Sequence, residues 1–150
     1  MKTLHYFSIA LCLLILTTTS CTKYEEVKES ELPVITYTSI TPKMVKQFEE
    51  NVVITINYKD GNGDLGHENP DDLSIYVKDN RLKKEDYYHL HLLSPPSKSI
   101  AIQGALDIHL KNTFLIGSGN SESTTYEIKI KDRAGNWSNS ITTEPITINK

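Results

Sequence analysis

Two acidic turns carry the residues whose types and spacing are best suited to chemistry. Asp60, Asn62 and Asp64 stand at alternate positions of a glycine-containing stretch, and Asp132 and Asn136 flank a second turn. Ca²⁺ takes roughly six to eight oxygens from carboxylates, amides, carbonyls and water, and alternate spacing lets one turn wrap several of them around one ion. The pattern predicts a Ca²⁺ site. The alternative is two metal-free hairpin turns, in which Asp and Asn hydrogen-bond their own backbone.

Two other motifs overlap the first turn, and both fail. An EF-hand loop would need Gly at Leu65 and Glu at Asp71, with a helix on each side, and no helices are expected there. The stretch from Gly61 to Gly66 also reads G-x-G-x-x-G, but Pro70 follows where a dinucleotide-binding fold needs a helix. The neighbouring carboxylates would in addition repel a pyrophosphate.

Cys21 is the second candidate for chemistry. An apolar run from Phe7 to Leu16 follows a short positive amino terminus that contains Lys2, and small polar residues lead into the cysteine. The run is too short for a spanning helix, which needs about twenty residues, so it predicts a targeting segment. A cysteine in this place resembles the lipobox of bacterial lipoproteins. The resemblance implies cleavage before Cys21 and a diacylglycerol on its sulfur; the alternative is ordinary secretion with a spare thiol.

The cysteine count agrees with lipidation, although the motif departs from the family pattern. Thr18 and Ser20 stand where lipoboxes usually carry Leu and Gly or Ala. The only other cysteine, Cys12, lies inside the targeting segment, so the mature chain has no disulfide. Two or more acyl chains give stable anchoring. We therefore expect an outer-membrane, lipid-anchored protein that faces the cell surface or the periplasm.

The sequence divides into a signal peptide (1–20), a lipidated cysteine with a flexible tether (21–33) and one domain (34–150). The tether is charged and has no apolar period. Its Lys23–Glu26 run resembles the export tag of some surface lipoproteins, and a plain charged linker is the alternative. The net charge is −3, and loss of Lys2 with the signal peptide makes it −4. This mildly acidic balance argues against a nucleic-acid partner, which needs a concentrated basic surface.

Apolar residues alternate with polar ones through most of the domain, which is typical of half-buried β-strands. Short helical turns fit only at 42–50 and 81–88. About seven to nine short strands predict an all-β sandwich. The expected strands are Val34–Ile40, Val52–Tyr58, Leu73–Val77, Tyr87–Leu93, one starting at Ile100, Leu106–Leu110, Tyr126–Ile130, Trp137–Thr143 and Pro145–Ile148.

The stretches Tyr58–Gly66 and Tyr126–Asn139 resemble signature segments of small, largely uncharacterised bacterial lipoproteins with an immunoglobulin-like (Ig-like) domain. The Asp-x-Ala-Gly-Asn ending also resembles the last hairpin of many bacterial Ig-like and cadherin-like repeats. The resemblance implies an Ig-like sandwich. In that topology the loops after strands B and F leave at the same end, which would bring the two acidic turns together. The fold implies no reaction, because it hosts many unrelated roles.

The remaining candidates point to binding rather than catalysis. His89 and His91 share a strand face, but a zinc site needs more ligands, so solvent-facing histidines are favoured. Trp137 is interpreted as a packing anchor. The expected function is non-enzymatic: a membrane-anchored binding or scaffolding module with a protein or glycan ligand. The alternatives are a carbohydrate-binding accessory lipoprotein of a nutrient-uptake system and, least favoured, a hydrolase, for which no G-x-S-x-G elbow is present.

Overall fold

The computed structural model describes residues 30–150. The predicted signal peptide, the lipidation site Cys21 and the tether up to residue 29 lie outside the described residues. Within 30–150 every regular element is a β-strand, and no helix there is long and apolar enough to cross a membrane. The predicted all-β class is confirmed.

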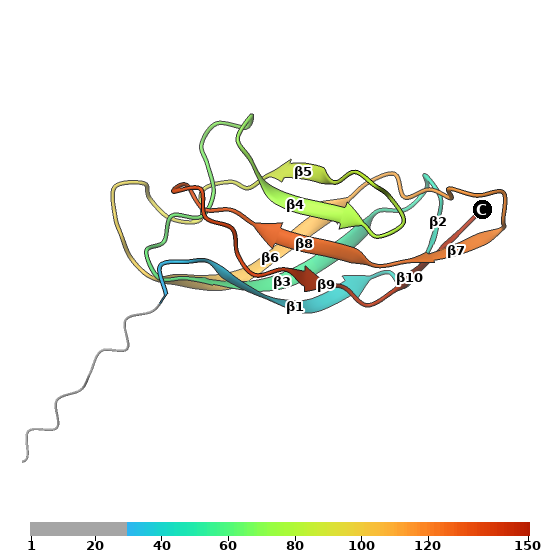
Figure 1. The fold of residues 1–150 in the computed structure, drawn as a ribbon, viewed down its shortest axis with the longest axis horizontal. Coiled ribbons are helices and arrows are strands. Elements are labelled where there is room, and N and C mark those ends of the chain that lie inside the picture. The colour runs from blue at the N-terminus through green and yellow to red at the C-terminus, as the bar shows by residue number, and fades with distance from the viewer. Residues whose placement is uncertain (1–29) are drawn as a thin grey trace, which may run out of the picture.

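Ten strands form three sheets (Figure 1). One sheet has the order β1-β3-β6, and a four-stranded sheet has the order β5-β4-β8-β9; both are antiparallel. A small third sheet, β2-β10-β7, contains a parallel pair. The strands are β1 (Val34–Thr41), β2 (Met44–Lys46), β3 (Val52–Asp60), β4 (Leu73–Asp79), β5 (Asp86–His89), β6 (Ile102–Leu110), β7 (Ser121–Thr124), β8 (Tyr126–Ile130), β9 (Ile141–Thr142) and β10 (Ile146–Asn149).

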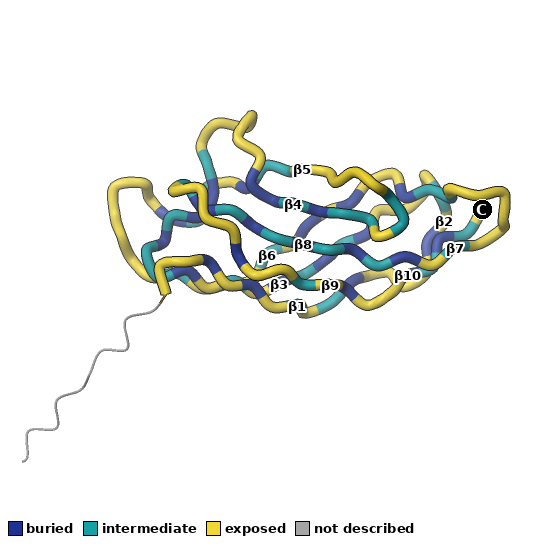
Figure 2. The backbone as a smooth tube through the Cα atoms, viewed as in Figure 1, coloured by how far each residue is buried: buried dark blue, intermediate teal, exposed yellow. Residues whose placement is uncertain are grey.

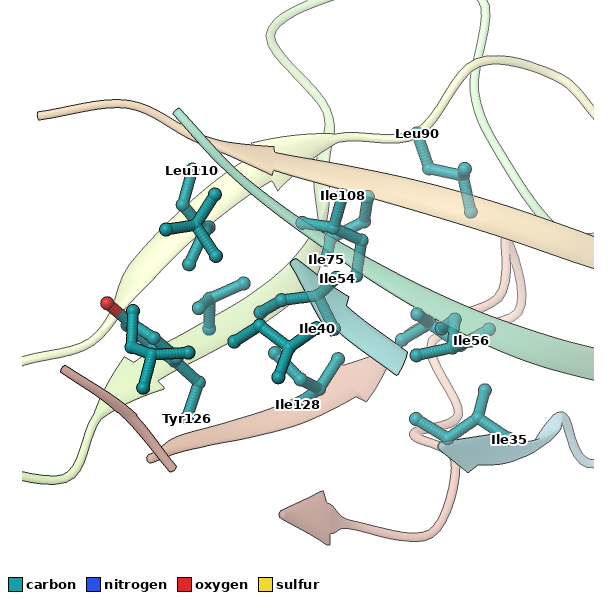
Figure 3. Packing of buried hydrophobic residues seen from close by; sticks show 14 of the residues in the cluster. Ile35, Ile40, Ile54, Ile56, Ile75, Leu90, Ile108, Leu110, Tyr126 and Ile128 are labelled. Carbon is teal, nitrogen blue, oxygen red and sulfur yellow. The ribbon is translucent and has the colours of Figure 1, made fainter. Parts of the chain in front are cut away.

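The two larger sheets face each other as in a β-sandwich and enclose one aliphatic core. Burial alternates along the strands, as the sequence pattern predicts (Figure 2). Ile54 and Ile56 of β3 and Ile128 of β8 are 0% exposed and belong to the same cluster (Figure 3). Burying each such side chain contributes about 1.5–3 kcal/mol. The core therefore fixes which strand faces point outward and carry any surface site.

Several predicted elements differ from the observed ones. The helical turns expected at 42–50 and 81–88 do not form. Met44–Lys46 instead pairs with β10, and Arg81 hydrogen-bonds Asp79 within a turn. The two strands expected between Ile100 and Leu110 are one strand, β6. The strand predicted over Trp137–Thr143 shrinks to β9.

Trp137 and Ser138 still pair with the end of β8, and the predicted strand is interrupted at Asn139. The Asn139 side chain accepts a hydrogen bond from the backbone N–H of Ile35 at 2.9 Å and donates one to the Ile35 carbonyl at 2.9 Å. These bonds tie the segment before β9 to the edge of the opposite sheet and compete with strand pairing.

The loops at one end of the sandwich lie together. The loop from β3 to β4 and the loop from β8 to β9 meet there, beside the start of the described chain (Figure 1). The Gly61 N–H donates to the Ser30 carbonyl at 3.0 Å, so the tether enters at this end. The carboxyl terminus lies at the other end.

Candidate functional site

The two acidic turns predicted to meet do come together at the tether end; we call Asp60, Asn62, Asp64, Asp132 and Asn136 the acidic pole. Asp60 ends β3 and is 1% exposed, and Asp132 follows β8 and is also 1% exposed. Leu65 and Asp132 pair as an antiparallel bridge between the two loops. The five residues are therefore parts of one structure rather than of two separate hairpins.

In the second turn, both carboxylate oxygens of Asp132 accept hydrogen bonds from within the turn. Asp132 Oδ1 accepts a hydrogen bond from the Asn136 backbone N–H at 2.7 Å, and Asp132 Oδ2 accepts one from Asn136 Nδ2 at 2.9 Å. This is the local Asx-type bonding expected of a metal-free turn. Asp132 and Asn136 thus close the β8–β9 loop and contribute a fixed negative charge to the pole.

The first turn leaves oxygens without partners. Asp60 Oδ2 accepts the Asp64 backbone N–H at 2.8 Å. Three more side-chain oxygens of this turn, Asp60 Oδ1, Asn62 Oδ1 and Asp64 Oδ1, are buried and accept no hydrogen bond from any residue in 30–150. An unsatisfied buried acceptor costs about 1–3 kcal/mol, and more when it is charged. The alternate spacing that drew attention to this turn therefore places three unsatisfied oxygens at one locality.

Burial raises the pKa of Asp60, and the negative charges of Asp64 and Asp132 raise it further, against the opposing hydrogen bond from the Asp64 backbone. The Asp60 carboxylate therefore lies within electrostatic range of both Asp64 and Asp132. A cation bound among these carboxylates would reduce the repulsion between their negative charges.

Arg133 lies beside the acidic pole and was not among the residues predicted from the sequence. Its backbone N–H donates to the Asp64 carbonyl at 3.0 Å, and its Nη1 donates to the carbonyls of Leu65 and Gly66 at 3.2 and 3.1 Å. Its Nη2 donates to the Gly63 carbonyl at 3.4 Å, so the Arg133 side chain joins the two loops through carbonyl oxygens rather than through an ion pair with a described carboxylate. The signal was its place in the Asp-Arg-Ala-Gly-Asn turn, next to Asp132.

The side-chain oxygens that could bind a metal at the acidic pole belong to different chemical groups. Within residues 30–150, no three His, Cys, Asp or Glu side chains converge as a metal cluster of those types alone. The oxygens without partners come from two carboxylates and one amide. Asp71, farther along the same loop, is exposed, and its backbone N–H donates to the Asn69 side chain.

A second feature lies on the outer surface of the β5-β4-β8-β9 sheet; we call Tyr76, Tyr87, Trp137, Lys129 and Lys131 the aromatic face. Tyr76 lies in register between Tyr87 on β5 and Lys129 on β8. Its ring centroid is 5.8 Å from that of Tyr87 and 6.3 Å from that of Trp137, both edge to face. Such geometry is favourable for aromatic pairs.

The aromatic face is accessible and has cations beside it. Tyr87 is 42% exposed and Trp137 39%. Lys129 Nζ lies 4.2 Å from the Tyr76 ring centroid, and Lys131 Nζ lies 5.3 Å from that of Trp137. Trp137, interpreted from the sequence as a packing anchor, packs against Tyr76 and Tyr87 and is also partly exposed. Exposed aromatic rings with polar neighbours are typical of ligand-binding surfaces.

His89 and His91 contact each other beside the end of β5. His89 Nε2 and His91 Nδ1 are 3.2 Å apart, and His89 Nδ1 contacts the Asp72 carbonyl at 3.1 Å. His67 is paired along the backbone with His91, and its Nδ1 lies 3.6 Å from Asp72. Backbone pairing thus brings His67, which is distant in sequence, beside His91.

A shallow groove of about 560 Å³ crosses the outer face of the other large sheet. Tyr58 and Lys59 are the ionisable residues of its lining, and the remaining residues are aliphatic or carry amide and hydroxyl groups. Tyr58 leans over Gly104 on β6, where an added Cβ would lie 2.7 Å from the tyrosine hydroxyl. Glycine at position 104 therefore leaves the space that the Tyr58 ring occupies.

Comparison of the chain with family models, with curated proteins and with solved structures finds no match to any of the three.

Proposed function

We propose that this chain is a lipid-anchored, non-enzymatic binding module that is exposed outside the cytoplasm. The observation that carries the proposal is the aromatic face: three rings clustered on a flat sheet, with Tyr87 and Trp137 about two-fifths exposed. Aromatic side chains are enriched at binding surfaces because they bury large area at low entropic cost. The anchor is Cys21, on the sequence argument given above.

The sheet order supports an Ig-like version of the sandwich. The order β1-β3-β6 corresponds to strands A, B and E of an Ig domain, and β4-β8-β9 corresponds to C, F and G, with β5 added beside C. The tether enters at one end of the long axis (Figure 1), so an anchored domain would leave both sheet faces open to partners.

Two measurements test this function. Mass spectrometry of the mature amino terminus is expected to find Cys21 at the first position and acylated; an unacylated product would overturn the anchor. Capture of partner proteins from the envelope fraction of the producing cell is expected to depend on Trp137, so that Trp137→Ala loses the partner. Phe48→Ala is the matched control, because Phe48 is also an exposed aromatic side chain (65%) but lies outside the aromatic face.

A carbohydrate ligand is the second candidate, and the composition of the aromatic face favours it. Sugar rings stack on aromatic side chains, and their hydroxyls bond charged neighbours. Lys129 and Lys131 lie against the rings, and Glu127 is 3.8 Å from Lys129 Nζ. A glycan array probed with the purified protein, with Trp137→Ala and with Phe48→Ala distinguishes the two ligands. If the protein binds a glycan on the array and Trp137→Ala abolishes that binding, the ligand is a glycan. If nothing on the array binds but protein capture depends on Trp137, the ligand is a protein.

A further inference from the structure

We propose that the acidic pole binds one Ca²⁺ ion through Asp60, Asn62 and Asp64, and that this ion locks the β3–β4 loop at the point where the tether enters the domain. The proposal does not rest on the binding function of the aromatic face, which lies on the outer surface of the β5-β4-β8-β9 sheet.

The donors have the required chemistry. Three side-chain oxygens at alternate positions, two from carboxylates and one from an amide, are buried and lack a hydrogen-bond donor within residues 30–150. Ca²⁺ is a hard cation that takes carboxylate and amide oxygens at about 2.3–2.6 Å and completes its shell with carbonyls and water. One ion would satisfy all three oxygens and neutralise two charges.

The burial of Asp60 shows that the turn is more than a solvated acidic cluster. Asp60 is 1% exposed, one of its oxygens is fixed by the Asp64 N–H, and the other has no partner among the described residues. Ionised carboxylates in protein interiors are normally paired or bound to metals, because leaving one unpaired is costly. Arg133, in the β8–β9 loop, donates to the carbonyls of Leu65 and Gly66 instead.

The backbone is shaped to hold this arrangement. Gly63 has a φ of +68°, and a Cβ there would lie 2.0 Å from the Ile100 carbonyl oxygen. The left-handed conformation and the close approach both require glycine. The loop therefore keeps Asn62 and Asp64 on either side of a tight turn, with Asp60 held at the end of β3.

The position of the site gives the ion a mechanical role. The Gly61 N–H bonds the Ser30 carbonyl at 3.0 Å, and the Arg133 N–H bonds the Asp64 carbonyl at 3.0 Å. An ion on Asp60, Asn62 and Asp64 would thus order the turn that ties the first described residues to β3 and to the β8–β9 loop. Calcium would set how rigidly the domain stands on its tether.

The test uses the full chain purified in detergent and stripped with EGTA. Calorimetric titration with Ca²⁺ is expected to show one site with a dissociation constant at or below roughly 1 mM. At 10 mM Ca²⁺ the thermal midpoint is expected to rise by about 5 °C or more. Mg²⁺ is expected to bind at least about tenfold more weakly, since it requires a smaller octahedral site.

Two isosteric variants locate the ion. Asp60→Asn and Asp64→Asn are each expected to weaken Ca²⁺ binding about tenfold or more, because each removes a ligand charge. Asp60→Asn is also expected to raise the midpoint in EGTA, since it removes a buried unpaired charge. Asp86→Asn is the matched control: Asp86 is exposed at the start of β5 and should leave both quantities unchanged.

Hydrogen exchange provides a readout that needs no variant. Ca²⁺ is expected to slow exchange in peptides covering residues 60–66 and to leave the distant strand β7 unchanged. The proposal is overturned if the folded wild-type protein shows neither a binding heat nor a midpoint shift with Ca²⁺. It is equally overturned if Asp60→Asn and Asp64→Asn respond to Ca²⁺ as the wild type does, because the ion would then sit elsewhere.

Discussion

Substituting Gly66 by Ala should destabilise the domain far more than the same substitution at Gly135. Both glycines have positive φ angles, +84° and +93° respectively, so alanine at either position costs about 1 kcal/mol of backbone strain. Only the surroundings differ. A Cβ at Gly66 would lie 2.1 Å from the His91 carbonyl oxygen and 2.9 Å from the Leu92 Cα, whereas a Cβ at Gly135 has no heavy atom within 4 Å.

The magnitude follows from this overlap. Ordinary non-bonded contacts lie near 3.5 Å, so the backbone at His91 would have to withdraw by more than about 1 Å. Its neighbour Leu90 is 3% exposed and part of the core, and the His67 N–H bonds the Leu90 carbonyl at 2.8 Å. Overpacking of this kind costs roughly 1–3 kcal/mol beyond the strain. We therefore expect a loss of about 2–4 kcal/mol for Gly66→Ala and about 1 kcal/mol for Gly135→Ala.

Urea unfolding followed by circular dichroism measures both losses, with equal m-values as the check that only stability has changed. Equal destabilisation by the two variants would refute the reasoning, because it would mean that the β3–β4 loop does not pack against the segment after β5 as described. A greater loss of stability for Gly135→Ala than for Gly66→Ala would refute the reasoning more strongly. Backbone strain at an open position would then cost more than a collision with the backbone.

Two further predictions concern charge. Arg81→Met should cost roughly 3 kcal/mol in urea unfolding, because it removes the cation that bonds the largely buried carboxylate of Asp79 at 2.7 Å. Lys43→Met, which breaks an exposed ion pair, should cause no measurable change. In EGTA, stability should rise as pH falls from about 7 towards 4, because the raised pKa of Asp60 means that the folded chain takes up that proton first. Asp60→Asn should remove this gain, and a gain of the same size in the variant would contradict the assignment.

Acid unfolding at still lower pH has a different origin. Burial alone would raise the pKa of Asp79, but hydrogen bonds from Arg81 and Thr124 outweigh burial and hold that pKa below its usual value. A carboxylate with a lowered pKa stabilises the fold above the pKa of the unfolded chain, near pH 4, and this stabilisation is lost as pH falls through the folded value. As pH falls, protonation of Asp60 is thus expected to raise the stability of the fold, and protonation of Asp79 is expected to lower it.

Local pattern was sufficient for the class of the fold and for many of the strands. Residues 52–58 and 126–130 alternate cleanly, and β3 and β8 form there with the expected inward faces. The pattern failed where pairing depends on distant partners. Met44–Lys46 has no alternation of its own and becomes a strand only because β10, about a hundred residues later, lies parallel to it. Trp137 and Ser138 still pair with Lys131 and Ile130, but the strand predicted there is interrupted at Asn139, whose side chain bonds Ile35.

The sequence by itself determined the alternation that makes this an all-β domain and the spacing that sets Asp60, Asn62 and Asp64 on one turn. These are local properties, fixed by a period of two and by glycine. Only the tertiary structure decided which groups became neighbours: Arg133 on the carbonyl of Leu65, 68 residues away, and Tyr76, Tyr87 and Trp137 on one face. The physical reason is that strand order depends on burial of the whole core, and no single segment of the sequence determines that burial.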